Sequence, residues 1–258
     1  LWQRGRGRDP AYASWNMPSS TNPLLDAALI EEERARLPER VWRQEYGAEF
    51  LEGSGAVFRN VRERALLDWQ EPVKGEHYYA GLDLAKVEDF TVMVVMNRRR
   101  EVVFVDRFHR LDWSLQVARI KGIYERFRMP LVMLDSTGAG EPVFEALRVA
   151  GCRNIQPYPF TAKSKTDLVN NLSLMFEKSE ITLPKPELWP EGIDELEAFE
   201  YSVTESGSVK TGSPSGIHDD CAIALALAAW QVKHAPAAPQ IHVANDWNQI
   251  RRIMRSFR

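Results

Sequence analysis

The sequence predicts an α/β protein built on one mixed β-sheet, with three antiparallel strands followed by parallel strands and with helices on both faces. Two observations support this prediction. Three β-branched and aromatic runs, residues 78–84, 90–97 and 101–108, are separated only by short polar connections, which is typical of antiparallel strands. After them, short apolar runs alternate with segments of helical spacing, which is typical of strand–helix units.

The elements that follow the three strands can be predicted in order. Helical spacing indicates helices over residues 113–127, 142–149, 166–178 and 191–199, and residues 131–134 and 155–160 are expected to be strands. Residues 200–204 and 208–211 flank Glu205-Ser206-Gly207, which predicts a hairpin. Residues 219–232 are apolar almost throughout, so this last helix should be buried.

The chain divides into three regions by the pattern of apolar and polar residues along the sequence. Residues 1–72 lack strand alternation and carry helical stretches at 22–36 and 39–50, so we expect a linker or helical arm. Residues 73–234 should form the α/β domain, and residues 235–258 a basic tail. For this tail, a solvated end and a basic segment that binds a partner or DNA are both open. Because the first residue is Leu1 and not Met, we expect a fragment of a longer polypeptide.

Composition excludes several classes of protein. With 44% hydrophobic and 27% charged residues among 258, the chain can form a core without disulfides, and Cys152 and Cys221 should be reduced and buried. No apolar run approaches the roughly 20 residues of a membrane span, so no membrane association is expected. The net charge of −3 argues against a chain coated in basic charge, but it permits a local basic face beside acidic residues.

Four aspartates stand where structural elements are expected to begin or end. Asp83 comes late in the first strand, Asp135 ends the short apolar strand, and Asp219 and Asp220 open the last helix. A carboxylate that ends an apolar strand is costly unless it is paired or binds a cation. Alternate alanines between residues 222 and 228 let this helix lie close to the sheet, which would bring its first carboxylates near the strand ends. For Asp219, an ordinary helix cap is an open alternative.

Clustered carboxylates repel one another and normally require a hard cation such as Mg²⁺ or Mn²⁺. Two such ions, about 3.5–4 Å apart, clamp both oxygens of a phosphodiester displacement. On this hypothesis Asp83 bridges two divalent cations, while Asp135 and the Asp219–Asp220 pair each hold one.

Three motifs carry a resemblance to a known family: Gly-Leu-Asp83, Leu-Asp135-Ser-Thr-Gly and Gly-Ile-His218-Asp219-Asp220. They resemble the acidic motifs of tailed-bacteriophage terminase large subunits, and residues 42–58 resemble the segment that joins motor and nuclease there. The resemblance covers most of residues 20–234. It implies a ribonuclease H-like fold and an endonuclease that cleaves double-stranded DNA during viral genome packaging. It also implies the portal protein and the small terminase subunit as partners, in the host cell cytoplasm.

The resemblance extends to further residues. Asp89 matches another acidic residue that approaches the metal site in related terminases, although a solvated loop residue is equally open. The hairpin over residues 201–210 resembles the family's DNA-facing hairpin. Lys210, Lys163 and Lys165 are candidates for phosphate contacts, with solvated lysines as the alternative. His218 is expected either to assist a metal ligand or to cap the helix.

Other classes of protein are less consistent with the residues present. A haloacid dehalogenase-like phosphatase needs a second Asp two residues after the first, where this chain has Ala85. An actin-like sugar kinase needs glycine-rich phosphate loops, which this sequence lacks. The sequence also contains no P-loop motif, so this chain should not hydrolyse ATP. Two alternatives stay open: a non-catalytic packaging module that docks onto the portal, and another ribonuclease H-like nuclease such as a resolvase.

Overall fold

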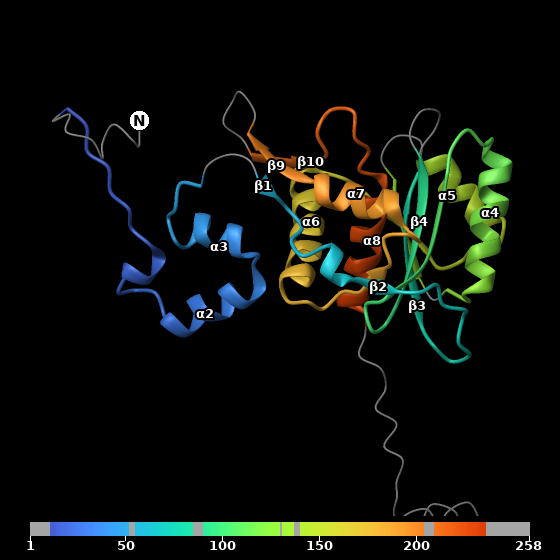
Figure 1. The fold of residues 1–258 in the computed structure, drawn as a ribbon, viewed down its shortest axis with the longest axis horizontal. Coiled ribbons are helices and arrows are strands. Elements are labelled where there is room, and N and C mark those ends of the chain that lie inside the picture. Colours follow the sequence, from blue (N-terminus) through green and yellow to red (C-terminus); the bar gives the residue numbers. More distant parts are fainter. Residues whose placement is uncertain are drawn as a thin grey trace, which may run out of the picture.

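The central sheet has five strands in the order β5-β4-β3-β6-β7 (Figure 1). The computed structural model describes residues 11–51, 55–84, 90–129, 131–136, 140–203 and 209–235. The strands are β3 (Tyr78–Asp83), β4 (Thr91–Asn97), β5 (Val102–Phe108), β6 (Leu131–Asp135) and β7 (Ile155–Tyr158). β3, β4 and β5 pair antiparallel, whereas β6 pairs parallel with both β3 and β7. The predicted mixed sheet is confirmed.

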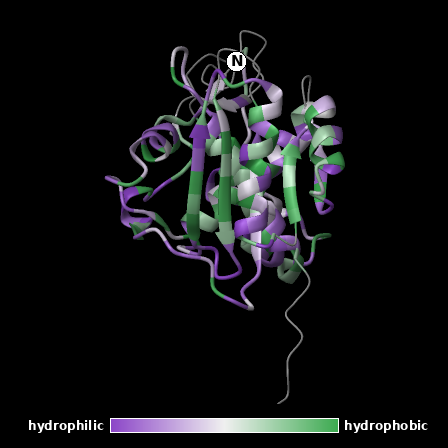
Figure 2. Cartoon of the chain, turned by 90° about the vertical axis from the view of Figure 1, so that its right-hand side faces the viewer, coloured by the Kyte–Doolittle hydropathy of each residue, from purple (hydrophilic) through white to green (hydrophobic). Residues whose placement is uncertain are grey.

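Helices cover both faces of this sheet, as Figure 1 shows. On one face lie α4 (Trp113–Arg126) and α5 (Gly140–Val149), and on the other lie α6 (Ala162–Glu177), α7 (Pro190–Ala198) and α8 (Asp220–His234). Alternate residues of a strand point to opposite faces. In β4, Met93 and Val95 therefore pack with α4 and α5, while Val92 and Val94 pack with α6 and α8. Both faces are apolar, and Figure 2 shows hydrophobic colouring in the middle of the sheet.

Helix α8 is buried nearly throughout because the sheet covers one side and α6 and α7 the other. It lies against β3 so closely that a Cβ built on Gly81 would stand 1.9 Å from the carbonyl oxygen of Ala224. The Nε2 of Gln231 donates a hydrogen bond of 2.6 Å to the carbonyl of Ala80. The small residues expected to allow a close approach to the sheet do so.

The N-terminal region contributes more buried side chains to the core than its sequence pattern indicated. It contains η1 (Ser19–Thr21), α2 (Ala27–Arg36) and α3 (Glu39–Glu45), followed by β1 (Gly55–Ala56), η2 (Arg62–Arg64) and β2 (Ala65–Leu67). Val57, Phe58 and Val61 are buried in the same cluster as α6, α7 and α8. The segment after residue 55 is thus packed onto the α/β domain. The domain boundary at residue 72 stays a prediction.

Several element boundaries differ from the expected ones. α3 ends at Glu45, before the expected residue 50, while α6 begins at Ala162, four residues before residue 166. The early start of α6 has a local cause, because Thr161 and Ser164 form a reciprocal capping box. The hairpin strands β9 (Glu200–Val203) and β10 (Val209–Gly212) pair as predicted, and β1 joins them. The expected turn at 205–207 lies outside the described residues.

Two further predictions can be compared with the structure. Cys152 and Cys221 are both buried and free. No helix in the described part of the chain has the length and apolar character needed to cross a membrane. A short parallel pair between β2 and β8 (Leu183–Pro184) was not expected, because strands of two or three residues show no periodicity.

Candidate metal and nucleic-acid site

Asp83 and Asp135 end two neighbouring parallel strands at the same edge of the sheet. Leu82 of β3 pairs with Leu134 of β6, so the next residue of each strand is an aspartate at the same level. Neighbouring strands lie about 4.8 Å apart, and residues at the same level share a face. The face is the one covered by α8, since Tyr79 and Met133, which share the parity of the two aspartates, belong to its cluster.

Asp220 is the first residue of α8 and is 8% exposed. Its Oδ2 accepts a hydrogen bond of 3.2 Å from the backbone N–H of Phe90. The same oxygen lies 3.5 Å from Nδ1 of His218. His218 thus lies against a predicted metal ligand, and its role stays a prediction.

Asp219 occupies the N-cap position of α8 without capping it. Among the described residues, its side chain accepts no hydrogen bond from the helix. Its Oδ2 instead lies 3.3 Å from Nζ of Lys165 on α6. The ordinary cap, which the sequence left open for Asp219, is therefore wrong.

The other three carboxylates lie within electrostatic range of Asp83. Burial raises the pKa of Asp83 well above its ordinary value, and the charges of Asp220, Asp135 and Asp219 raise it further, while Lys165 opposes them. Asp83 is thus the carboxyl group on which the charges of the other three act, and its role as a bridging ligand stays a prediction.

The donor atoms are carboxylate oxygens, the ligand type that Mg²⁺ and Mn²⁺ prefer. In the part of the chain that the structure describes, however, no three His, Cys, Asp or Glu side chains are arranged to hold a metal ion. The chemistry of the donor set still fits divalent cations, because all four side chains offer carboxylate oxygens.

Two of the three lysines that were predicted to contact DNA line one cavity, and one of these two pairs with Asp219. Lys165 and Lys210 line a cavity of about 360 Å³ between α6 and β10, together with Phe160, Thr161, Ala162, Thr166 and Thr211. Lys163 is exposed on the first turn of α6. Asp89 lies outside the described residues, and its place near the metal site stays a prediction.

Three residues beside the cluster were not singled out in the sequence. The guanidinium of Arg107 lies 3.3 Å from the ring centroid of Phe90, and the ring of Phe90 meets His218 edge-on. Arg107 also lies 3.7 Å from Glu195 of α7, whose Oε2 accepts a hydrogen bond of 2.7 Å from the N–H of Cys221. In the sequence, Glu195 is one of several acidic residues in a helix, and no spacing marks it.

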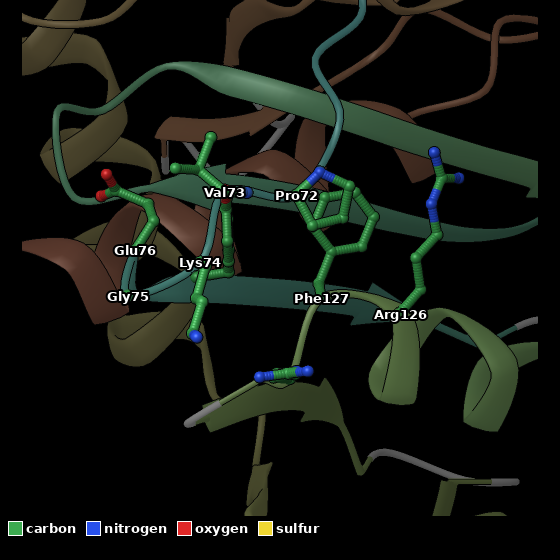
Figure 3. Close-up of a pocket in the computed structure, with 9 residues that line it drawn as sticks. Pro72, Val73, Lys74, Gly75, Glu76, Arg126 and Phe127 are labelled. Atoms are coloured by element: carbon green, nitrogen blue, oxygen red, sulfur yellow. The ribbon is translucent and has the colours of Figure 1, made fainter.

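A second cavity, of about 210 Å³, is shown in Figure 3. Lys74, Glu76 and Arg126 are among the residues that line it. It lies at Tyr78, the first residue of β3, whereas Asp83 is the last residue of that strand. This cavity is therefore at the opposite edge of the sheet and takes no part in the carboxylate site.

Comparisons with known proteins show the family to which the chain belongs. Residues 80–231, more than half of the chain, match the family described as the terminase RNaseH-like domain. The large terminase subunit of Thermus virus P23-45 is 33% identical over 208 residues, which are 76% of this chain and 42% of that protein. The chain thus spans less than half the length of that relative.

Solved structures give the same result. The large terminase nuclease from thermophilic phage G20c with bound magnesium has a TM-score of 0.62 and 29% identity, covering 68% of this chain and 97% of that one. The same G20c nuclease has been crystallised with bound cobalt and with bound zinc. The large terminase nuclease domain of Thermus phage P74-26 has a TM-score of 0.61 and 29% identity, covering 69% and 95%.

The sheet order, the acidic motifs and these matches lead to one conclusion. The chain belongs to the family of terminase ribonuclease H-like nuclease domains, from the large subunits of bacteriophage terminases.

Proposed function

We propose that this chain is a metal-dependent endonuclease that cuts double-stranded DNA by two-metal phosphodiester hydrolysis during viral genome packaging. The observation that carries the proposal is the convergence of Asp83 and Asp135, at two parallel strand ends, with Asp219 and Asp220 at the start of α8. On this proposal Asp83, Asp135 and the Asp219–Asp220 pair would together hold two cations of Mg²⁺ or Mn²⁺, with Asp83 as the shared ligand.

The cations, when bound, would activate water and stabilise the leaving oxygen. The chain's own residues hold and orient the reacting groups. The hydrogen bond from the N–H of Phe90 and the neighbouring His218 fix the orientation of Asp220. Lys165, which lies 3.3 Å from Asp219, offsets part of the negative charge of the cluster. This arrangement limits the repulsion that an approaching DNA phosphate meets.

Lys165 and Lys210 border the cavity beside the cluster, and we propose that they contact the DNA backbone there. Lys163 lies on the exposed first turn of the same helix and would extend this contact. Lysines provide point charges that bind phosphate without reading base sequence. The proposed nuclease should therefore show little sequence preference.

The family implies partners and a location that we also adopt as proposals. These are double-stranded DNA, the portal protein and the small terminase subunit, in the host cell cytoplasm. A chain that only docked onto the portal would have no need of three carboxylates in electrostatic range of a buried Asp83. Asp89 is proposed as an additional residue near the cations.

The proposal is tested by incubating the chain with supercoiled plasmid and Mg²⁺ or Mn²⁺, with and without EDTA. We expect nicked and linear products that disappear in EDTA. Undiminished cutting in EDTA would contradict a metal-dependent mechanism. Cutting of four-way junctions in strong preference to linear duplex would favour a resolvase. A chain that binds portal protein and never cuts would be the docking module.

A further inference from the structure

The first turn of α8 is capped from another helix. The first N–H groups of a helix have no partner inside it, and an aspartate at the N-cap normally accepts from one of them. In the described part of the chain, Asp219 accepts none, because its carboxylate faces Lys165 instead. The N–H of Cys221 donates to Oε2 of Glu195, at 2.7 Å. Glu195 of α7 therefore caps the first turn of α8, which is the role that an N-cap aspartate such as Asp219 normally has.

Glu195 is a costly residue to place there. It is 4% exposed, and a buried carboxylate is unfavourable unless hydrogen bonds and an opposite charge compensate it. The compensation is partial: the N–H of Cys221 donates to Oε2, whereas Oε1 has no hydrogen-bond partner among the described residues and faces the guanidinium of Arg107 of β5 at 3.7 Å. A purely structural position in this core would be filled at lower cost by an apolar side chain.

Arg107 links Glu195 to the other side of the cluster. Its guanidinium packs over the ring of Phe90, 3.3 Å from the centroid. Phe90 in turn donates its backbone N–H to Oδ2 of Asp220 at 3.2 Å. Glu195, Arg107 and Phe90 therefore form a brace that connects α7, β5 and the residue before β4 to the start of α8.

We propose that Glu195, supported by Arg107, is a positioning residue for the Asp219–Asp220 pair. By capping α8 in place of Asp219, it leaves the Asp219 carboxylate out of the helix cap and beside Lys165, where it would be available to a divalent cation. It also fixes the first turn of α8, and with it the direction of Asp220. This inference rests on the proposed function, because it assumes that the pair binds cations.

The test distinguishes the effect of the position of the Glu195 acceptor oxygen from the effect of the Glu195 charge. Glu195→Gln keeps an acceptor oxygen at the same distance from Cys221 but removes the charge. Glu195→Asp keeps the charge but withdraws the acceptor by about 1.5 Å, the length of one carbon–carbon bond. Binding of Mn²⁺ to the purified 258-residue chain is measured by titration calorimetry, and folding by thermal melts.

We expect Glu195→Gln to bind Mn²⁺ nearly as tightly as wild type and Glu195→Asp to bind it about 10- to 100-fold more weakly, the range for residues that orient metal ligands. Ser173→Ala is the matched control. It removes another buried hydrogen bond, 2.9 Å long, to the carbonyl of Val57, in the same core but away from the start of α8. This control should melt at a lower temperature and bind Mn²⁺ as wild type does.

The outcomes distinguish a failure of the proposed function from a failure of the positioning role of Glu195. A wild-type chain that neither binds Mn²⁺ nor cuts DNA would overturn the proposed function and this inference with it. A wild type that binds and cuts, with Glu195→Asp binding Mn²⁺ equally well, would overturn the inference alone. Equal weakening by Glu195→Gln and Glu195→Asp would also overturn it, since losing the charge with the acceptor in place would then cost as much as losing the cap.

Discussion

Gly81 allows α8 to lie against β3, and Gly81→Ala tests whether this close approach matters for the site. A Cβ there would lie 1.9 Å from the carbonyl oxygen of Ala224, 2.6 Å from the nitrogen of Ala228 and 2.8 Å from Cβ of Leu227. Ordinary contacts begin at 3.4 Å, so α8 must move by about 1.5 Å, the difference between 3.4 and 1.9 Å. Two of the three clashing atoms are backbone atoms, so no side-chain rotation relieves the clash.

The expected cost follows from this displacement. Overfilling a packed core costs about 1–3 kcal/mol, and the backbone clash places Gly81→Ala near the upper end, at about 3 kcal/mol. For a domain of this size, that corresponds to a melting temperature lower by roughly 6–12 °C. A shift of about 1 Å in a catalytic group can cost about 100-fold in rate. Because Asp220 moves with α8 while Asp83 stays in β3, we expect plasmid cleavage to fall by that order.

Gly122→Ala is the control, because it makes the same chemical change in α4 where a Cβ meets nothing within 4 Å. Alanine in a helix interior is more stable than glycine by about 0.5–1 kcal/mol, so this variant should melt slightly higher and cut normally. Thermal melts and plasmid cleavage of both variants decide the matter. If Gly81→Ala melts and cuts like wild type, the close packing of α8 does not position the carboxylates.

Further predictions concern the charges of the site. Asp83→Asn removes one of several neighbouring negative charges, which at 4 Å and an effective dielectric of ~20 repel by about 4 kcal/mol before screening. In EDTA it should raise, or at least not lower, the melting temperature. Because the folded pKa of Asp83 is raised, this benefit is full above that pKa and is lost below the ordinary aspartate pKa of about 3.9. Wild type should gain more stability from added Mn²⁺ than Asp83→Asn does, and a destabilised variant with a full Mn²⁺ response would make Asp83 a structural residue. Lys210→Ala should weaken DNA binding uniformly and reduce the salt slope by about one unit, whereas Lys74→Ala, at the opposite edge of the sheet, should leave it unchanged. An unchanged slope for Lys210→Ala would make this lysine a solvated residue.

The parts of the fold that could be predicted are those whose residues carry their own pattern. The strands ending at Asp83 and Asp135 are apolar runs closed by an acid, and α8 is apolar on all sides because it is covered on all sides. The short β1, β2 and β8 could not be predicted, since two or three residues have no periodicity. The early start of α6 does have a signal in the sequence, because Thr161 and Ser164 stand at the spacing of a capping box.

At the candidate site, the contacts between distant residues could not be predicted from the sequence. The ion pair of Lys165 with Asp219 joins residues 54 positions apart, and the cap from Glu195 reaches Cys221 across 26. Such contacts depend on how α6 and α7 pack against α8, so the spacing of residues along the sequence does not predict them. The residue types and the strand ends predicted where carboxylates would gather. They did not indicate which neighbours hold these carboxylates in place.

The most direct test of the account is the number of Mn²⁺ ions that the chain binds, measured by titration calorimetry on wild type and on Asp83→Asn. Three carboxylates around a bridging Asp83 predict two ions in wild type, as in a two-metal hydrolase. Loss of the bridging ligand predicts that Asp83→Asn binds fewer ions or binds them far more weakly, and that it no longer cuts plasmid. A wild type that binds no Mn²⁺, or an Asp83→Asn variant with unchanged stoichiometry and affinity, would contradict the account.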